Sequence, residues 1–358
     1  MKKIRVLIVD DSALMRRFLR DVLSSDEQIE VVDTAADPII AREKIKRLDP
    51  DVITLDVQMP NMSGLDFLER LMRLRPTPVI MFSSLTYHEA NESLRALALG
   101  AVDVVAKPVA ATQAEWDSLA SSLIEKVKLA ASAHLQVTQP GVPPPRSTSG
   151  AGWTKEPHDR IVAIGASTGG VQALQTVLGA LPASCPPVLI SQHMPPNFTR
   201  SFTQRLDKHC AVSVCEAVDG APIQCGRVYV APGDRHILLE RRSNGYVCRL
   251  RGGAEYNGYM PSVDLMFQSV ASAAGPSSMG IVLTGMGKDG AAGLLQIHEA
   301  GGITVSQDEA SSLIYGMPKA AVAIGAAQIE LPIERMASLI VETTSNIRRI
   351  KKPERMQA

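Results

Sequence analysis

The sequence predicts an α/β protein with two doubly wound, mostly parallel sheets. Short apolar runs alternate with amphipathic stretches in two successive series, and parallel strands need crossovers that are usually helices. A segment rich in Pro, Gly, Ser and Thr separates the two series. In the second series, two alternating runs flank a short turn, which predicts a β-hairpin added to the parallel sheet.

The first series contains five apolar runs in about 130 residues. In chain order they are IRVLIVDD, EVVDTA, DVITLD, PVIMFSS and VDVVAKP, with helical patterns between them. Five βα repeats predict a doubly wound (βα)5 domain with helices on both faces of one sheet. A ligand site in such a sheet lies at the carboxyl ends of the strands.

The two series are joined by a linker. Between Gln139 and Gly152 the chain reads QPGVPPPRSTSGAG, where ten of fourteen residues are Pro, Gly, Ser or Thr, so this stretch predicts a partly extended spacer. We expect a first domain at residues 1–125 and a helix end plus linker at 126–157. A second domain at 158–345 and a basic tail at 346–358 complete the chain.

The second series predicts six strands: RIVAIG, PVLISQH, AVSVCE, RVYVAP, GIVLTG and GITVSQ. Helical stretches again intervene, which favours a second doubly wound sheet. Around residues 236–251 the chain reads HILLERRSNGYVCRL, with two alternating runs about a Ser-Asn-Gly turn. This pattern predicts the hairpin.

Composition excludes several classes of protein. The 37 basic and 37 acidic residues cancel, so no overall field favours nucleic acid or an anionic membrane. Asp10 and Asp11 end the first apolar run too early for a signal peptide, and no other stretch approaches a spanning length. Five cysteines without a CxxC pair indicate neither a disulfide framework nor a zinc site. We therefore expect a reduced, cytoplasmic protein that does not insert into the membrane.

Carboxylates cluster at the strand ends of the first domain. Asp10 and Asp11 follow the first strand and Asp56 ends the third. Such a cluster is costly without a cation, and oxygen ligands of this kind suit Mg²⁺ with room for a phosphoryl group. Ser83 and Lys107 end the fourth and fifth strands, where both could contact phosphoryl oxygens. Alternatively, the aspartates are helix N-caps and Lys107 is a solvated side chain.

These five residues at strand ends resemble the response-regulator receiver domain over residues 1 to about 125. The resemblance implies that Asp56 is the phosphoacceptor and that Asp10 and Asp11 hold Mg²⁺ with it. It also implies that Ser83 and Lys107 sense the phosphoryl group. A partner histidine kinase would supply the phosphate, and the added charge of about −2 would rearrange the neighbouring face.

A serine lies on a sharp turn at the start of the second domain. GASTGG, residues 165–170, follows the strand RIVAI, and its first five residues satisfy G-x-S-x-G. Those glycines permit a strand-to-helix turn that exposes the Ser167 hydroxyl. A phosphate-binding glycine loop or a serine N-cap would give the same local pattern.

A nucleophilic serine needs a base and a group that orients it. Of the seven histidines only His193, in VLISQHMPP, directly follows an apolar strand, and Asp289 follows another. A structural histidine and an aspartate N-cap are the alternatives, but three such residues on strand ends of one sheet favour a Ser-His-Asp set. Their chain order differs from that of α/β-hydrolases, which implies a different fold.

The motifs IGASTGG, SQHMPPNFT and LTGMGKDGAAG together resemble the catalytic domain of the chemotaxis protein-glutamate methylesterases, from about Arg160 to Thr343. The resemblance implies hydrolysis of glutamate γ-methyl esters on methyl-accepting chemoreceptors, with deamidation of receptor glutamines. It implies catalysis by Ser167, His193 and Asp289 without a cofactor at that site. The backbone N–H groups of Thr168 and Met286 would hold the oxyanion.

A second hypothesis is a receiver joined to a non-catalytic nucleotide-binding module. Gly285, Gly287 and Gly290 satisfy G-x-G-x-x-G after an apolar strand, and the acidic pair Asp308 and Glu309 lies about 20 residues further on. This reading explains both glycine loops but gives His193 no role.

Joining the two domains suggests regulation. If the unmodified first domain packs across the Ser167 cleft, phosphorylation of Asp56 by a chemotaxis histidine kinase would weaken that contact and open the site.

Overall fold

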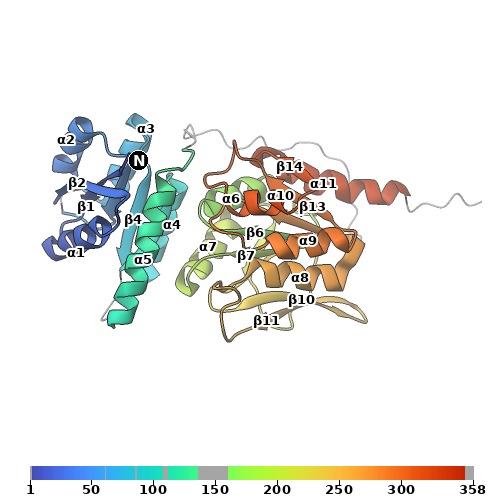
Figure 1. Cartoon of the computed structure of the whole chain (residues 1–358). Helices are drawn as coiled ribbons and strands as arrows, with labels where there is room; N and C mark the ends of the chain where they lie inside the picture. The colour runs from blue at the N-terminus through green and yellow to red at the C-terminus, as the bar shows by residue number, and fades with distance from the viewer. Residues whose placement is uncertain (1, 61, 85–86, 108–111, 136–159, 351–358) are drawn as a thin grey trace, which may run out of the picture. The chain divides into compact units, whose positions relative to one another are not determined.

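Each half of the chain builds its own parallel sheet (Figure 1). The computed structural model describes residues 2–60, 62–84, 87–107, 112–135 and 160–350. The chain divides into two units, Met1–Gln139 and Pro140–Ala358. Most of the expected linker, residues 136–157, and the last part of the expected tail, residues 351–358, lie outside the described residues.

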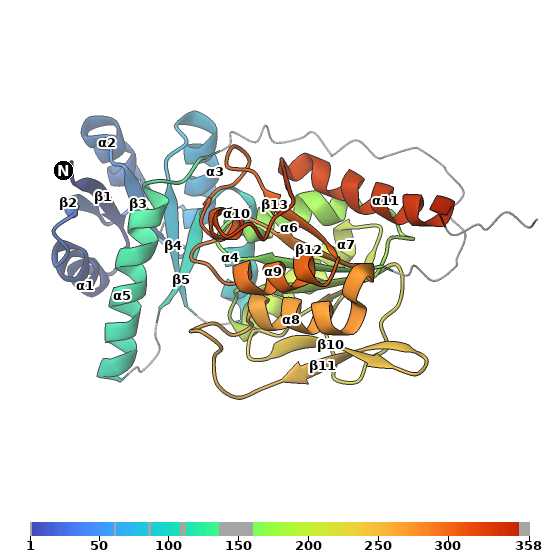
Figure 2. The same cartoon turned by 45° about the vertical axis from the view of Figure 1, so that its right-hand side comes forward.

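The first unit is the expected (βα)5 domain. Its five parallel strands have the order β2-β1-β3-β4-β5, and helices cover both faces of the sheet (Figures 1 and 2). The strands are β1 (Ile4–Val9), β2 (Ile29–Ala35), β3 (Val52–Asp56), β4 (Val79–Ser84) and β5 (Asp103–Lys107). The helices are α1 (Ala13–Ser24), α2 (Pro38–Leu48), α3 (Gly64–Leu74), α4 (Tyr87–Ala98) and α5 (Gln113–Ala130).

Local sequence explains where the helices of this unit begin. Ser12 and Ser63 cap α1 and α3 by accepting hydrogen bonds from backbone N–H groups of the first turn. Asp37 caps α2 in the same way, followed by a proline in the first turn. Strand β3 is buried along its whole length, as expected for a central parallel strand covered on both faces.

The second unit contains a seven-stranded parallel sheet of order β14-β13-β12-β6-β7-β9-β8. Its strands are β6 (Ile161–Ala166), β7 (Val188–Gln192), β8 (Ser213–Glu216), β9 (Arg227–Val230), β12 (Ser278–Val282), β13 (Ile303–Gln307) and β14 (Ile329–Leu331). Its helices are α6 (Gly170–Gly179), α7 (Pro196–His209), α8 (Val263–Ala274), η1 (Gly275–Ser277), α9 (Ala291–Glu299), α10 (Met317–Ala323) and α11 (Ile333–Ile350).

In both units, strands are added on one side of the first strand and later strands are added on its other side, which creates a topological switch. In the first unit this switch lies between β1 and β3, and in the second between β6 and β12. Ligands of open α/β sheets bind in the crevice outside the carboxyl ends of the strands at such a switch. The fold therefore indicates one candidate site in each unit.

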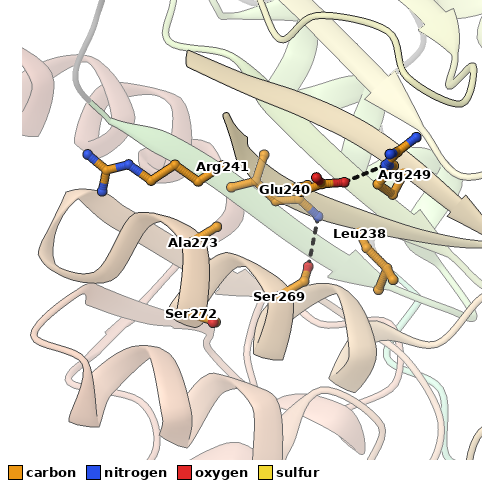
Figure 3. A pocket seen from close by; sticks show the side chains of 8 residues that line it. Leu238, Glu240, Arg241, Arg249, Ser269, Ser272 and Ala273 are labelled. Carbon is orange, nitrogen blue, oxygen red and sulfur yellow. Dashed lines mark hydrogen bonds and ion pairs between the residues drawn. The ribbon is translucent and has the colours of Figure 1, made fainter. Parts of the chain in front are cut away.

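The predicted hairpin is present as β10 (His236–Arg242) and β11 (Gly245–Arg251). It forms its own two-stranded sheet and is not hydrogen-bonded to the seven-stranded sheet. Strand β10 packs against α8, where the Leu239 N–H donates a 2.9 Å hydrogen bond to Ser269 Oγ. Figure 3 shows side chains that line a groove between hairpin and helix. The volume of this groove is about 430 Å³. None of the residues predicted as site residues lines that groove.

Two further details differ from the expectation. Strand β14 was not predicted, because a three-residue strand with half-exposed and exposed side chains has no readable alternation. Residues 346–350, which we expected in the basic tail, are the end of α11. No helix among the described residues is both long enough and apolar enough to span a bilayer.

Candidate active site

Ser167 directly follows β6, the central strand of the second sheet. The turn from Ser167 to Gly169 leads into α6, and Gly169 has φ 80°, a left-handed conformation that favours glycine. Backbone hydrogen bonds fix the turn: Ser167 N–H donates to Thr284 O at 3.1 Å, and Ser167 O accepts from Gly170 N–H at 2.8 Å. The predicted strand-to-helix turn therefore presents Ser167 at the carboxyl edge of the sheet.

Close packing of two chain segments makes glycine necessary at position 285. A Cβ built there would lie 2.7 Å from Ser167 Cβ and 2.4 Å from Met317 Sδ. Both distances are well below the normal non-bonded separation of about 3.5–4.0 Å between carbon atoms. Gly285 thus lets the segment after β12 pass directly beside Ser167.

His193 follows β7, which neighbours β6. The register pairs Ala166 with Gln192, and His193 N–H donates a 3.1 Å hydrogen bond to Ala166 O. The Gln192 side-chain amide donates to Ser167 O at 2.9 Å and to His193 O at 3.1 Å. The serine and the histidine therefore start neighbouring loops that one glutamine holds together.

Asp289 is 2 % exposed and lies within a dense set of donors. His193 Nε2 lies 2.8 Å from its Oδ2. Ser262 Oγ donates to Oδ1 at 3.1 Å, and the backbone N–H groups of Val263 and Asp264 donate at 2.7 and 2.9 Å. Asp289 thereby caps the N-terminus of α8, a stabilising position for a carboxylate.

The ionisation of Asp289 follows from these contacts. Burial raises the pKa of Asp289, but the hydrogen bond and charge of His193 and the two α8 amides outweigh burial, so the pKa lies below its ordinary value of 3.8. Asp289 is a carboxylate at neutral pH, ready to orient an imidazole and to balance an imidazolium.

Hydrogen bonds among the described residues join His193 to Asp289, but they do not join the Ser167 hydroxyl to His193. Catalytic hydrogen bonds are often loose before substrate binds and tighten in the complex. The structure thus places the three predicted residues in the loops that follow the adjacent strands β12, β6 and β7, and it forms one of the two contacts that a Ser-His-Asp set requires.

The two residues predicted to hold an oxyanion belong to the two segments that meet at Ser167. Thr168 is the next residue of the turn, and Met286 follows Gly285. Thr284 ties the two segments together: its Oγ1 lies 3.0 Å from Thr168 O and accepts a 2.9 Å hydrogen bond from Ile314 N–H. Sequence reasoning missed Thr284, since nothing local distinguishes it from an ordinary strand-end threonine.

The nucleotide-binding alternative meets an obstacle at α9. A dinucleotide pyrophosphate would sit at this helix N-terminus, but the Asp264 carboxylate accepts hydrogen bonds there from Gly290 N–H at 3.0 Å and Gly293 N–H at 2.7 Å. Asp308 accepts from Ser311 N–H within its own turn at 3.0 Å. An anionic side chain therefore already occupies the position at the α9 N-terminus where the pyrophosphate would lie, which disfavours the nucleotide-binding alternative.

Asp264 was also missed by sequence reasoning. It is 5 % exposed, and burial is the largest of the effects that raise its pKa, with the neighbouring Asp289 charge adding to it. The reciprocal arrangement, in which Asp289 caps α8 and Asp264 of α8 caps α9, depends on contacts about 25 residues apart along the chain. No local pattern marks such a pair.

The first unit brings its predicted acidic residues together. Carboxylate oxygens of Asp10, Asp11 and Asp56 lie within 4.8 Å of one another. Lys107 Nζ lies 2.8 Å from Asp56 Oδ2 and 3.1 Å from Asp10 Oδ2. A hard cation with several water ligands fits such a set of oxygens, so the residues present suit Mg²⁺.

Burial shapes the charges of this cluster. It raises the pKa of Asp56, and the Lys107 ammonium offsets that effect only in part. Burial also lowers the pKa of Lys107, but its contacts with Asp56 and Asp10 reverse the effect and raise it. Ser83 lies near the end of β4 and is 1 % exposed. All five predicted residues therefore lie at the carboxyl edge of the sheet.

The two units together define a class of protein: a (βα)5 unit with three carboxylates and a lysine at its carboxyl edge, joined to an α/β unit with serine, histidine and aspartate in the loops after adjacent strands. Family models agree with both halves. Residues 6–115 match the response regulator receiver domain and residues 162–340 match the CheB methylesterase. The chain belongs to the CheB methylesterase family.

Similar proteins match along nearly the whole chain. A protein-glutamate methylesterase/protein-glutamine glutaminase of Xanthomonas euvesicatoria is 48% identical over 96% of this chain and 98% of its own. One from Salmonella typhimurium is 49% identical over 91% of this chain and 92% of its own. The crystal structure of the Thermotoga maritima CheB methylesterase catalytic domain superposes with a TM-score of 0.50 at 34% identity, covering 51% of this chain and 98% of that domain.

Proposed function

We propose that Ser167, His193 and Asp289 carry out the protein-glutamate methylesterase and protein-glutamine glutaminase reactions for which the relatives of this chain are named. The observation that carries the proposal is the 2.8 Å contact of His193 Nε2 with the buried Asp289, at the strand end beside Ser167. The substrates would be γ-methyl esters and γ-amides of glutamate and glutamine side chains on methyl-accepting chemoreceptors.

The orientation of His193 assigns its two nitrogens. Nε2 faces Asp289, so Nδ1 exchanges the proton with Ser167. Ser167 Oγ attacks the γ-carbonyl carbon as Nδ1 takes its proton, and the carbonyl oxygen becomes an oxyanion. Asp289 fixes the tautomer and stabilises the imidazolium. When the tetrahedral intermediate collapses, the bond to the leaving group breaks, and methanol from an ester or ammonia from an amide departs with the His193 proton.

A water molecule then hydrolyses the glutamyl ester of Ser167. His193 takes a proton from the water and returns it to Ser167 Oγ, which leaves a free glutamate side chain. The backbone N–H groups of Thr168 and Met286 hold the oxyanion in both halves of the reaction, and losing one such donor typically costs about 10²- to 10³-fold in rate. Nucleophile, base and oxyanion donors are all supplied by the chain, so we propose no cofactor at this site.

In the first unit, Asp56 would accept a phosphoryl group from a chemotaxis histidine kinase. Asp10, Asp11 and Asp56 would hold Mg²⁺, which neutralises charge on the transferring phosphoryl group when bound. Lys107 lies 2.8 Å from the acceptor carboxylate and would exchange that contact for phosphoryl oxygens. Ser83, buried near the same edge, would contact the group as well.

We further propose that phosphorylation of Asp56 raises the hydrolytic activity of the second unit. The phosphoryl group adds a charge of about −2 at neutral pH, enough to rearrange a protein face. We also propose that the domain boundaries lie at residues 125, 157 and 345. The protein would act in the cytoplasm on chemoreceptors.

Methanol release tests the proposal. The full chain is incubated with membranes that carry methyl-labelled chemoreceptors and with a small-molecule phosphodonor, and Ser167→Ala is run in parallel. We expect release that depends on Ser167. Release that persists in Ser167→Ala would remove Ser167 as the nucleophile, and nucleotide affinity without any release would favour the non-catalytic alternative.

A further inference from the structure

An aromatic side chain lies against the histidine of the proposed relay. The ring of Tyr259 stacks on the imidazole of His193, with centroids 4.5 Å apart and the planes inclined by 14°. This separation and near-parallel arrangement match a stacked aromatic contact. The two residues come from different elements, since His193 follows β7 and Tyr259 lies in the loop between β11 and α8.

A tight turn delivers Tyr259 to this position. Tyr256 and Tyr259 exchange backbone hydrogen bonds of 3.0 and 3.1 Å, so Asn257 and Gly258 form a two-residue loop. Both of these residues have positive φ, 53° and 83°, which is the conformation of a type I′ turn. Asn-Gly is the preferred sequence for that turn, so local sequence specifies the geometry that carries Tyr259.

The hydroxyl end of Tyr259 lies close to a second segment of the chain. A Cβ built on Gly287 would lie 2.4 Å from Tyr259 Oη, so the hydroxyl rests against the backbone between Met286 and Asp289. The ring therefore bridges the His193 loop and the segment after β12. The Tyr259 side chain remains half-buried.

The stacked Tyr259 ring restrains rotation of the His193 imidazole, and such rotation would interrupt proton transfer. The imidazole must keep Nε2 on Asp289 while Nδ1 faces Ser167. Rotation of the ring out of its plane would break the contact of Nε2 with Asp289 and would turn Nδ1 away from Ser167, and the stacked Tyr259 ring opposes that rotation. The negative face of the aromatic ring also favours the imidazolium that forms during the reaction.

We propose that Tyr259 is a positioning residue that holds the His193 imidazole between Asp289 and Ser167. The inference deepens the proposed function and rests on it. Because Tyr259 acts through His193 and not through the bound ester, its removal should slow the chemical step without weakening substrate binding.

The experiment compares steady-state methanol release by the full chain and three variants on the same receptor membranes. Tyr259→Ala removes the ring, and we expect kcat to fall about 10- to 100-fold, as expected for a misplaced catalytic group, with KM unchanged within about threefold. Tyr259→Phe keeps the ring and should restore most of that loss. A rise in KM at unchanged kcat would overturn the proposal, because Tyr259 would then act as a wall for substrate.

Tyr256→Ala is the matched control. It deletes an equally large ring from the same turn, but Tyr256 contacts Gln268 and not His193. We expect its kcat to stay close to that of the unsubstituted chain. An equal fall in kcat for Tyr256→Ala and Tyr259→Ala would mean that the loop matters only as structure, which contradicts the proposal.

A readout independent of activity separates this inference from the proposed function. In an NMR spectrum of the full chain, the ring protons of His193 should be shifted upfield by the Tyr259 ring current and should move downfield in Tyr259→Ala but not in Tyr256→Ala. Identical His193 shifts in all three proteins would overturn the stack. Absence of Ser167-dependent hydrolysis together with the expected shifts would instead overturn the proposed function.

Discussion

Two buried carboxyl groups, Asp264 and Asp289, belong to one hydrogen-bonded cluster, and their pKa values are shifted in opposite directions. Asp264 N–H donates to Asp289 at 2.9 Å, and the Asp289 charge adds to the burial that raises the pKa of Asp264. His193 and two backbone N–H groups outweigh burial at Asp289 and lower its pKa. When the environments of two neighbouring carboxyl groups shift their pKa values in opposite directions, the two groups can take different roles, and the group with the lowered pKa stays ionised.

We predict that Asp264 takes up a proton before Asp289 when the pH falls. Since the folded-state pKa of Asp289 is lowered, its contribution to stability is present above its ordinary value of 3.8 and is lost as the pH falls through the lowered value. Asp264 has the opposite sign, because its raised pKa means that the folded state binds its proton more tightly. Carbon NMR of the two carboxyl groups measures the order, and protonation of Asp289 first would contradict it.

Glycine at 285 gives a second prediction about single residues. Gly285→Ala would place a methyl group 2.7 Å from Ser167 Cβ and 2.4 Å from Met317 Sδ, so Ser167 must move. We expect a fall in kcat of about 10²-fold, typical of a misplaced catalytic group, with a loss of about 1–3 kcal/mol in stability from overpacking. Gly179→Ala is the control, since its Cβ meets nothing within 4 Å. Unchanged kcat in Gly285→Ala would contradict the close approach.

Sequence reasoning singled out Ser167, His193 and Asp289 because each follows an apolar run. It could not identify Thr284, Asp264 or Tyr259, whose importance comes from partners about 25 to 116 residues distant. Threonine, aspartate and tyrosine at such positions have ordinary local explanations. The Asn-Gly turn that carries Tyr259 was readable in the sequence, but its contact with His193 required the fold.

At the scale of elements, α8 and α9 are coupled through their N-termini. Asp289, just before α9, caps α8, and Asp264, in the first turn of α8, caps α9. Each carboxylate satisfies backbone N–H groups that have no partner within their own helix. The aspartate that contacts His193 is therefore held by the same hydrogen bonds that cap the first turn of α8.

We predict that Asp264→Ala destabilises the second unit by about 1–2 kcal/mol, because the first amides of α9 lose their acceptor. Asp264→Asn should lose less, since an amide oxygen still accepts those hydrogen bonds and the repulsion with Asp289 disappears. Calorimetry of the full chain measures both variants. An equal loss of stability in the two variants would show that Asp264 does not stabilise the protein by capping α9.

The elements themselves were largely predictable. All five strands of the first sheet and six of the seven strands of the second were expected from apolar runs. The hairpin was expected too, but not its separation from the parallel sheet. Alternation specifies which face of a strand is buried and does not specify the neighbouring strand. That is why sheet order, the isolated hairpin and the short β14 needed the structure.

At the scale of the whole molecule, the same topological rule places both sites. Asp10 and Asp56 lie on either side of the β1–β3 switch, and Ser167 and Asp289 on either side of the β6–β12 switch. Carboxyl ends of neighbouring strands meet there without a crossover above them. The two units of this chain therefore share the position of their candidate sites and differ in the side chains that follow the strands.

We predict that phosphorylation couples the two sites. A small-molecule phosphodonor with Mg²⁺ should raise methanol release by the full chain about tenfold, within the usual range of allosteric coupling, and Asp56→Asn should abolish the rise while keeping the basal rate. Release measured with and without the phosphodonor checks this. An equal rise in Asp56→Asn would show that the effect does not pass through Asp56.

The proposed mechanism requires a covalent acyl intermediate on Ser167. The most direct measurement is an acid quench of the reaction with a short peptide that contains a glutamate methyl ester, followed by digestion and mass spectrometry of the peptide that contains Ser167. We expect a glutamyl ester on Ser167 that is absent from Ser167→Ala and reduced in His193→Gln. Methanol release without any mass increase on the Ser167 peptide, under conditions in which the peptide is fully recovered, would contradict the account.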